Sequence, residues 1–238
     1  RAEALSEWSL NESVGLGNHV SRVKALSFGG TVASIQGKRR KAMRYFAQAM
    51  EMADELADPI HWVQTAYRKW ELSLGAKIDS AEIARLEDII EVAQTRGARD
   101  LHEYGLMLLS TSQFIMGHHD ESVELGGKLE KLGVEREHPR AVAYGRLAKA
   151  RVYSARLNVG EAYREAELVL KMPELLSEPL FQVRAEVWRL HALWAKNRLD
   201  QCHLSLRKVA SHLSAGVPLE LTMLPVAATM AKAVVGRK

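Results

Sequence analysis

The residues from Val23 to Leu56, VKALSFGGTVASIQGKRRKAMRYFAQAMEMADEL, decide the fold. Their apolar side chains recur at intervals of three and four on both sides of a break at Gln36 and Gly37. Apolar side chains at these intervals lie on one face of an α-helix. The stretch therefore predicts two helices joined by a tight turn, each with one face to bury.

Breaks of this kind recur about every 40 residues, which is typical of a repeat protein. They are centred near Gly37, Gly75, Gly117, Asn158 and Asn197. Helical apolar spacing flanks each break, and the residues that share a face before the second one are Ile60, Val63, Tyr67, Trp70 and Leu74. We expect longer connections between the pairs, marked by Asp58-Pro59, Gly97, Gly133 with Pro139, Pro173 with Pro179, and Gly216 with Pro218.

The pattern predicts an all-α fold of about five helical hairpins with a further helix at each end. Asp79 with Glu82 has the spacing of a capping box, and Pro59 suits the first turn of a helix. No segment alternates with period two, so a sheet is not expected. A single hairpin cannot bury its apolar face, so neighbours must stack into a right-handed α-solenoid with a concave surface. Residues 1–238 are expected to form one such domain.

The same stretch resembles a tetratricopeptide repeat, with small residues at Gly30, Ala33, Ala42 and Ala49, a turn at Gln36-Gly37, and Phe46. Gly30 and Ala42 would let the two helices approach closely, with Phe46 filling the space beside them. Later units match less well, at Tyr153, Ala162 and Val169, and at Leu190, Leu193, Cys202 and Val209. The Trp and Pro of the strict repeat are mostly missing.

A period of about 40 residues exceeds that of the strict repeat. It is similar to the degenerate repeats of large bacterial regulators, including the sensor modules of LuxR-type activators that resemble the maltose-regulon activator. The resemblance implies transcription regulation or signal transduction, through a superhelix that binds an inducer or a partner protein. The chain has no ATP-binding loop of the Gly-x-x-x-x-Gly-Lys type and no DNA-binding helix-turn-helix.

Composition places the chain among ordinary soluble globular proteins. Of its 238 residues, 47% are hydrophobic and 26% charged, and 33 Lys and Arg against 29 Asp and Glu give a net charge of +4. This charge is too small to suggest a nucleic-acid binder by itself. One cysteine, no membrane-length apolar stretch and an N-terminus without a signal-peptide core favour the cytoplasm. The apolar stretch 226–235 and the missing first Met suggest a piece of a longer protein.

Two clusters carry residue types that bind metals. His118, His119, Asp120 and Glu121 are adjacent, and adjacent residues of a helix point in different directions, so we expect a turn with acids at a helix start. Cys202 beside His203 is expected to be a packed thiol. We therefore predict no metal and no cofactor.

No serine lies in a Gly-x-Ser-x-Gly elbow, so we expect the chain not to be an enzyme. A catalytic triad assembled only in space stays open as an alternative.

The run Lys38-Arg39-Arg40-Lys41 falls at a predicted helix start, where the helix dipole disfavours cations. Placement against the dipole indicates either an acidic partner, such as a phosphate or a nucleic acid, or simply a solvated face. A nucleic-acid- or phosphate-binding helical array is the alternative function.

Tetratricopeptide proteins line their concave surface with residues of the first helix of each pair. Through this resemblance, the row begins at Thr31 and Ser34 and continues with Gln64, Arg68, Tyr144, Arg151, Arg184, His191 and Trp194. Arg68, Arg151 and His191 would be equivalent, whereas Trp62, Trp70 and Trp188 are expected in the core. Such a row suits an acidic peptide or an anionic small molecule, the alternative being scattered surface charges.

These features predict a non-catalytic helical-repeat module that binds a protein, a peptide or a small anionic effector, and that serves as a sensor or scaffold. A homo-oligomer is compatible with them, and a membrane partner is not expected.

Overall fold

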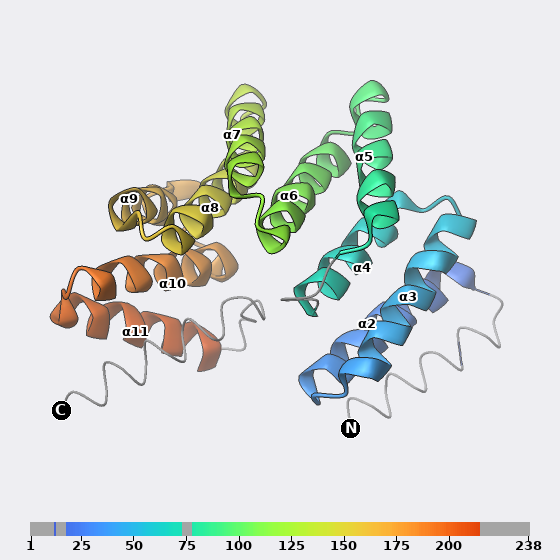
Figure 1. Cartoon of the computed structure of the whole chain (residues 1–238), viewed down its shortest axis with the longest axis horizontal. Helices are drawn as coiled ribbons and strands as arrows, with labels where there is room; N and C mark the ends of the chain where they lie inside the picture. The colour runs from blue at the N-terminus through green and yellow to red at the C-terminus, as the bar shows by residue number, and fades with distance from the viewer. Residues whose placement is uncertain (1–11, 13–17, 73–77, 215–238) are drawn as a thin grey trace. The chain divides into compact units, whose positions relative to one another are not determined.

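The computed structural model describes residue 12, residues 18–72 and residues 78–214, and within them it holds α-helices, one 3-10 helix and no strand (Figure 1). Packing groups residues 1–101 and 102–238 into two compact units, called unit 1 and unit 2 here. The prediction of an all-α helical-repeat fold is confirmed, because consecutive helices pack on one another within each unit.

Five successive helix pairs make up the described chain. Unit 1 holds α2 (His19–Ile35), α3 (Arg39–Glu55), α4 (Pro59–Leu72) and α5 (Ser80–Thr95). Unit 2 holds most of α6 (Arg99–Met116), then α7 (His119–Glu135), α8 (Pro139–Ala155), α9 (Val159–Leu170), α10 (Pro179–Ala195) and α11 (Leu199–Ser214). The 3-10 helix η1 (Pro173–Leu175) lies between α9 and α10. The even-numbered helices are the first helices of their pairs, and the odd-numbered helices are the second.

A left-handed residue ends most of these helices, and these residues recur at a fixed spacing. Positive φ angles occur at residues that lie 20 or 40 positions apart along the chain: Gly37, Ala57, Gly97, Gly117, Glu137, Leu157 and Asn197. At each of them the next residue donates its N–H to a carbonyl five residues back, as Lys38 does to Ala33 at 2.8 Å. This is the Schellman motif, which satisfies the last carbonyls of a helix.

The repeat of about 40 residues is therefore two copies of a helix plus a short turn. The prediction of longer connections between pairs was wrong for three of the four. The α3–α4, α5–α6 and α7–α8 connections are as short as the α2–α3, α8–α9 and α10–α11 turns, whereas the α9–α10 connection is longer. Ala57 and Glu137 adopt the left-handed conformation without being glycine, so no local residue signal distinguishes their turns.

Close helix contact holds the first pair together, as the sequence predicts. A Cβ atom at Gly30 would lie 2.5 Å from Cε1 of Phe46, so only glycine allows α2 to approach α3 this closely. Ala33, Ala42 and Phe46 form one buried cluster there. Trp62 and Trp70 are also buried, which confirms that they belong to the core.

The capping box predicted at α5 forms only in part. Asp79 accepts a hydrogen bond from the N–H of Ala81 at 2.9 Å and so caps the helix. Glu82 instead turns toward α4, where its carboxylate accepts a hydrogen bond from Trp70 Nε1 at 2.6 Å and pairs with Lys69. It therefore joins the two helices of the pair.

Unit 2 is built around a buried cluster from α8, α9, α10, α11 and η1, which includes Val169, Leu175, Phe181 and Trp188. A smaller cluster of Leu190, Leu193 and Cys202 joins α10 to α11.

Some predictions fall outside the described residues: the terminal helices, the break at Gly75, Gly216 with Pro218, and the stretch 226–235. Among the helices that are described, none has the length and apolarity that crossing a membrane requires.

Candidate binding surfaces

Arg151 and His191 occupy equivalent places 40 residues apart, as the sequence predicts, but Arg68 is three residues out of this register, contrary to the prediction. Each of the three side chains reaches another first helix. Arg68 Nη1 of α4 lies 3.3 Å from Ser27 Oγ of α2. Arg151 of α8 donates to Thr111 Oγ1 of α6 at 3.3 Å, and the ring of His191 on α10 bonds Ser154 Oγ of α8. The partners lie 37 to 41 residues away, which is one repeat. The row therefore joins successive first helices.

Arg151 does not line an open groove, contrary to the expectation from sequence. It is 7% exposed, and its guanidinium lies 4.6 Å from the centroid of the Phe114 ring. It also contacts the carbonyl oxygen of Ser110 at 3.4 Å. Stacking on a ring stabilises a desolvated guanidinium by cation–π attraction. Arg151 thus contributes to packing between α6 and α8.

Arg184 of α10 is also buried, at 8% exposure, again contrary to the expectation of an open groove. Its guanidinium lies 5.5 Å from the ring centroid of Tyr144 on α8. Tyr144 in turn packs edge-on against Phe181, with centroids 4.9 Å apart. These side chains hold α8 against α10.

His191 and Trp194 are partly buried. Burial lowers the pKa of His191, because the surrounding protein solvates the imidazolium less well than water does. Trp194 packs against the cluster of Leu190, Leu193 and Cys202. Ser154, the partner of His191, is itself buried, so a substrate could not reach its hydroxyl in this structure.

In unit 1 the predicted row lies on an open surface. Gln64 and Arg68 of α4 are exposed, and Thr31 and Ser34 of α2 are partly exposed. Large apolar side chains stand on the same two helices: Phe28 is 46% exposed, Ile35 79% and Ile60 53%. Phe28, Ile35, Ile60, Gln64 and Arg68 are called the open face below.

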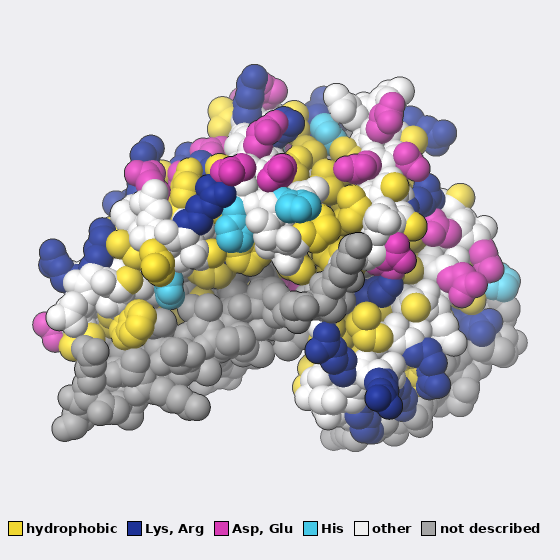
Figure 2. All heavy atoms as spheres, viewed as in Figure 1, with side chains coloured by type: hydrophobic (Ala, Val, Ile, Leu, Met, Phe, Trp, Pro, Cys, Tyr) yellow, Lys and Arg dark blue, Asp and Glu magenta, His cyan; other side chains and the backbone are white. Residues whose placement is uncertain are grey.

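The basic run lies where α2 turns into α3, and Figure 2 shows dark blue side chains gathered over this end of unit 1. Lys38 is the N-cap residue of α3, and the first turn of the helix contains no acid. Arg39, Arg40 and Arg44 are exposed, and the Arg44 guanidinium lies 5.9 Å from the Tyr45 ring centroid. The prediction of cations at a helix start is confirmed.

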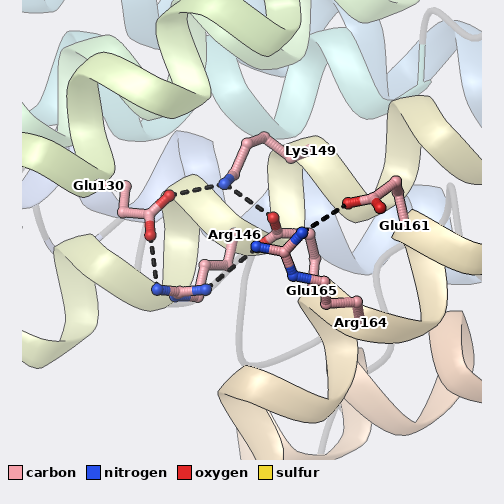
Figure 3. A network of polar contacts seen from close by, with 6 residues as sticks. All are labelled: Glu130, Arg146, Lys149, Glu161, Arg164 and Glu165. Carbon is pink, nitrogen blue, oxygen red and sulfur yellow. Dashed lines mark hydrogen bonds and ion pairs between the residues drawn. The ribbon is translucent and has the colours of Figure 1, made fainter.

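A partly buried ion network joins α7, α8 and α9, and no local motif in the sequence predicts it (Figure 3). Lys149 of α8 lies 2.6 Å from Glu130 of α7 and 2.9 Å from Glu165 of α9. Arg146, one turn earlier on α8, pairs with the same two carboxylates. Burial lowers the pKa of Lys149, but the hydrogen bonds to Glu130 and Glu165 outweigh it, so the pKa is raised.

A second ion network lies one repeat later, around the residue of α10 that is equivalent to Lys149 of α8. Arg189 of α10 pairs with Glu167 of α9 at 2.9 Å and with the buried Glu186 of its own helix at 2.8 Å. Lys69, Lys149 and Arg189 are spaced by whole repeats of about 40 residues, so they are equivalent. This recurrence of a cation on first helices is the signal that could have predicted the networks.

One further cluster lies in unit 2 around the buried Glu103. Its carboxylate accepts a hydrogen bond from Arg136 Nη1 at 3.0 Å and pairs with His138. Burial and then the charge of Arg136 lower the pKa of the neighbouring His102, and Glu103 only partly opposes them. The cluster ties the α7–α8 turn to α6.

The candidate metal ligands do not converge. Across the described residues, no group of three or more His, Cys, Asp or Glu side chains could hold a metal ion. His118 precedes α7 and contacts Gln113, while His119 stacks on Phe114. Asp120 lies in the first turn, where the hydrogen bond from Arg156 lowers its pKa. Burial raises the pKa of the Cys202 thiol, as in a packed cysteine.

Comparison with protein-family models found none that matches this chain, and comparison with curated proteins found no matching relative.

Proposed function

We propose that the chain is a non-catalytic binding module and that its binding surface is the open face of α2 and α4. The observation that carries this proposal is the exposure of Phe28, Ile35 and Ile60 on the two helices that also present Gln64 and Arg68. Large exposed apolar side chains set among polar ones are typical of interaction sites. A surface whose only role is to keep the protein in solution does not require such exposed apolar side chains.

The composition of this face favours a segment of a protein over a small anion. Phe28 and Ile35 are separated by two turns of α2, or about 10 Å, so a ligand must span this length to contact both. Arg68 has five N–H donors, and Ser27 and Thr31 contact only its Nη1. The remaining donors suit a carboxylate. The ligand is therefore an acidic segment with bulky apolar side chains.

The module would serve as the sensor or scaffold of a larger cytoplasmic bacterial regulator. This part of the proposal rests on the resemblance to degenerate tetratricopeptide repeats, supported by the pairing of helices at a period of about 40 residues.

A peptide selection tests the proposed surface. A displayed library of random peptides is selected on the chain, and the enriched peptides are then titrated into Ile35→Ser and into Leu204→Ser. Leu204 is an exposed leucine on α11, which makes it a matched control. We expect acidic peptides with bulky apolar residues, whose binding Ile35→Ser abolishes and Leu204→Ser leaves unchanged. Enrichment of peptides that bind both variants equally would refute the assignment of this face.

A further inference from the structure

The outward face of α3 carries a charge pattern that the binding surface does not explain. Its exposed side chains, called the stripe below, are Arg40, Arg44, Ala47, Gln48, Glu51 and Glu55. They lie opposite the buried residues Ala42, Phe46 and Ala53, which face the core. Both arginines precede Ala47, and both glutamates follow Gln48. Figure 2 shows dark blue side chains over the start of α3 and magenta ones toward its other end.

This pattern is unfavourable within α3 itself. Arg40 and Arg44 are like charges four residues apart, and so are Glu51 and Glu55; such pairs destabilise a helix. The dipole prefers acids at the start of a helix and cations at its end, which is the reverse of this order. None of the four has an ion pair with any other residue that the structure describes.

On the outward face of α7, the charges four residues apart are of opposite sign. There Glu124 precedes Lys128, and Lys131 pairs with Glu135, so that opposite charges lie four residues apart. The chain therefore satisfies surface charges locally on one second helix and leaves them unsatisfied on another. A partner with the complementary charge pattern would offset the like-charge repulsion within α3.

The charges along α3 are complementary to those of a second α3 that runs antiparallel to it. Arg44 and Glu51 lie equally far from the midpoint between Ala47 and Gln48, and so do Arg40 and Glu55. We propose that a second copy of this chain packs its α3 antiparallel against this one, with a two-fold axis at that midpoint. Arg44 of each copy then faces Glu51 of the other, and Arg40 faces Glu55. Such an isologous contact is the commonest form of homodimer interface.

The same residues disfavour a nucleic acid as the occupant. A polyanion that followed α3 from its basic start would meet Glu51 and Glu55 after about three to four turns. The carboxylates of these two residues would repel it. A second α3 matches both halves of the stripe, and the small Ala47 beside the axis lets the helices approach to about 8–10 Å.

The contact is weak and depends on salt, since exposed ion pairs contribute about 0–1 kcal/mol each and are screened. It uses the outward face of a second helix and leaves the open face of α2 and α4 free. The dimer is therefore independent of the proposed peptide binding, and either can fail without the other.

Charge reversal tests the dimer by sedimentation equilibrium at low and high salt. One variant carries Arg40→Glu with Arg44→Glu, and the other carries Glu51→Arg with Glu55→Arg. We expect the wild type to dimerise at low salt and each variant to associate about tenfold less tightly or worse. Mixing the two variants should restore a mixed dimer, because their stripes are then complementary. Circular dichroism of each variant confirms that it is folded.

Cross-linking locates the contact. Ala47→Cys places an exposed thiol beside the proposed axis, whereas the native Cys202 is buried. A short bis-maleimide should link two copies of this variant at low salt, and Gln64→Cys, on the open face, should remain unlinked. A wild-type chain that stays monomeric at low salt would overturn the proposal. So would association that survives both reversals, or DNA binding by the basic half of the stripe in place of dimerisation.

Discussion

The guanidinium of Arg151 on α8 stacks 4.6 Å from the centroid of the Phe114 ring on α6. The same side chain contacts Thr111 and the carbonyl of Ser110, so one arginine joins two first helices by both a ring and hydrogen bonds. Arg68 lies about two repeats earlier and reaches Ser27 of another first helix, but from an exposed position. Two arginines that both join first helices thus differ in burial.

This difference in burial predicts that alanine substitutions of Arg151 and Arg68 change the free energy of unfolding by unequal amounts. Arg151→Ala should lower the free energy of unfolding by about 1.5–3 kcal/mol, the range for hydrogen bonds to a charged group. Arg68→Ala should change it by less than about 0.5 kcal/mol, as is usual at exposed sites. Urea denaturation measures both. Equal effects of the two substitutions would show that the burial of Arg151 does not govern its role.

Close packing predicts the consequence of adding one methyl group. Gly30→Ala should destabilise the chain by about 1–3 kcal/mol, because its Cβ would overlap the Phe46 ring. Gly127→Ala is the matched control on α7, where a Cβ would meet nothing within 4 Å. There the better helix propensity of alanine should stabilise by about 1 kcal/mol. Thermal or urea unfolding that shows the same sign for both would contradict the packing described here.

The partly buried network predicts a clear loss of stability when one partner is removed. Glu165→Ala leaves Lys149 and Arg146 with Glu130 as their remaining carboxylate, so the free energy of unfolding should fall by about 1.5–3 kcal/mol, the range for hydrogen bonds to charged groups. Arg164→Ala breaks only the exposed pair with Glu161 and should cost at most about 1 kcal/mol. A small effect at Glu165 would mean that the network contributes little to the stability of unit 2.

The lowered pKa of His191 predicts how stability changes with pH. The unfolded chain binds a proton at the ordinary imidazole pKa of about 6.5, whereas the folded chain binds it only at lower pH. The stabilisation is therefore complete above about pH 6.5 and is lost as the pH falls below it. Tm should drop between pH 7.5 and 5.5. His191→Gln should flatten this drop, although His102 on α6, whose pKa is also lowered, will retain part of it.

The helix pairs could be predicted from the sequence because glycine and asparagine mark several of the turns. Gly37, Gly117 and Asn197 adopt the left-handed conformation that these residues tolerate. Ala57 and Glu137 adopt it too, although neither is glycine or asparagine, so no residue signal showed how short their turns are. Tertiary context overrides local preference at these two positions.

The sequence predicted which side chains join first helices better than it predicted their register and burial. Arg151 and His191 share one place in the repeat and Arg68 lies three residues out of it, and burial depends on which side chains the adjacent pair presents. Phe114 and Thr111 cover Arg151, whereas Ser27 and Thr31 leave Arg68 exposed. The partners of Lys149 likewise lie 16 and 19 residues away on different helices, beyond the reach of any local pattern.

If the open face of α2 and α4 binds an acidic segment, Arg68 should recognise a carboxylate of that segment. Isothermal titration of a selected acidic peptide into the wild type and into Arg68→Ala measures this contribution. Arg68→Ala should weaken binding by about 1.5–3 kcal/mol, the range for hydrogen bonds to charged groups, while the unfolding free energy stays nearly unchanged. Equal affinity of the two proteins for the peptide would show that Arg68 does not recognise the ligand.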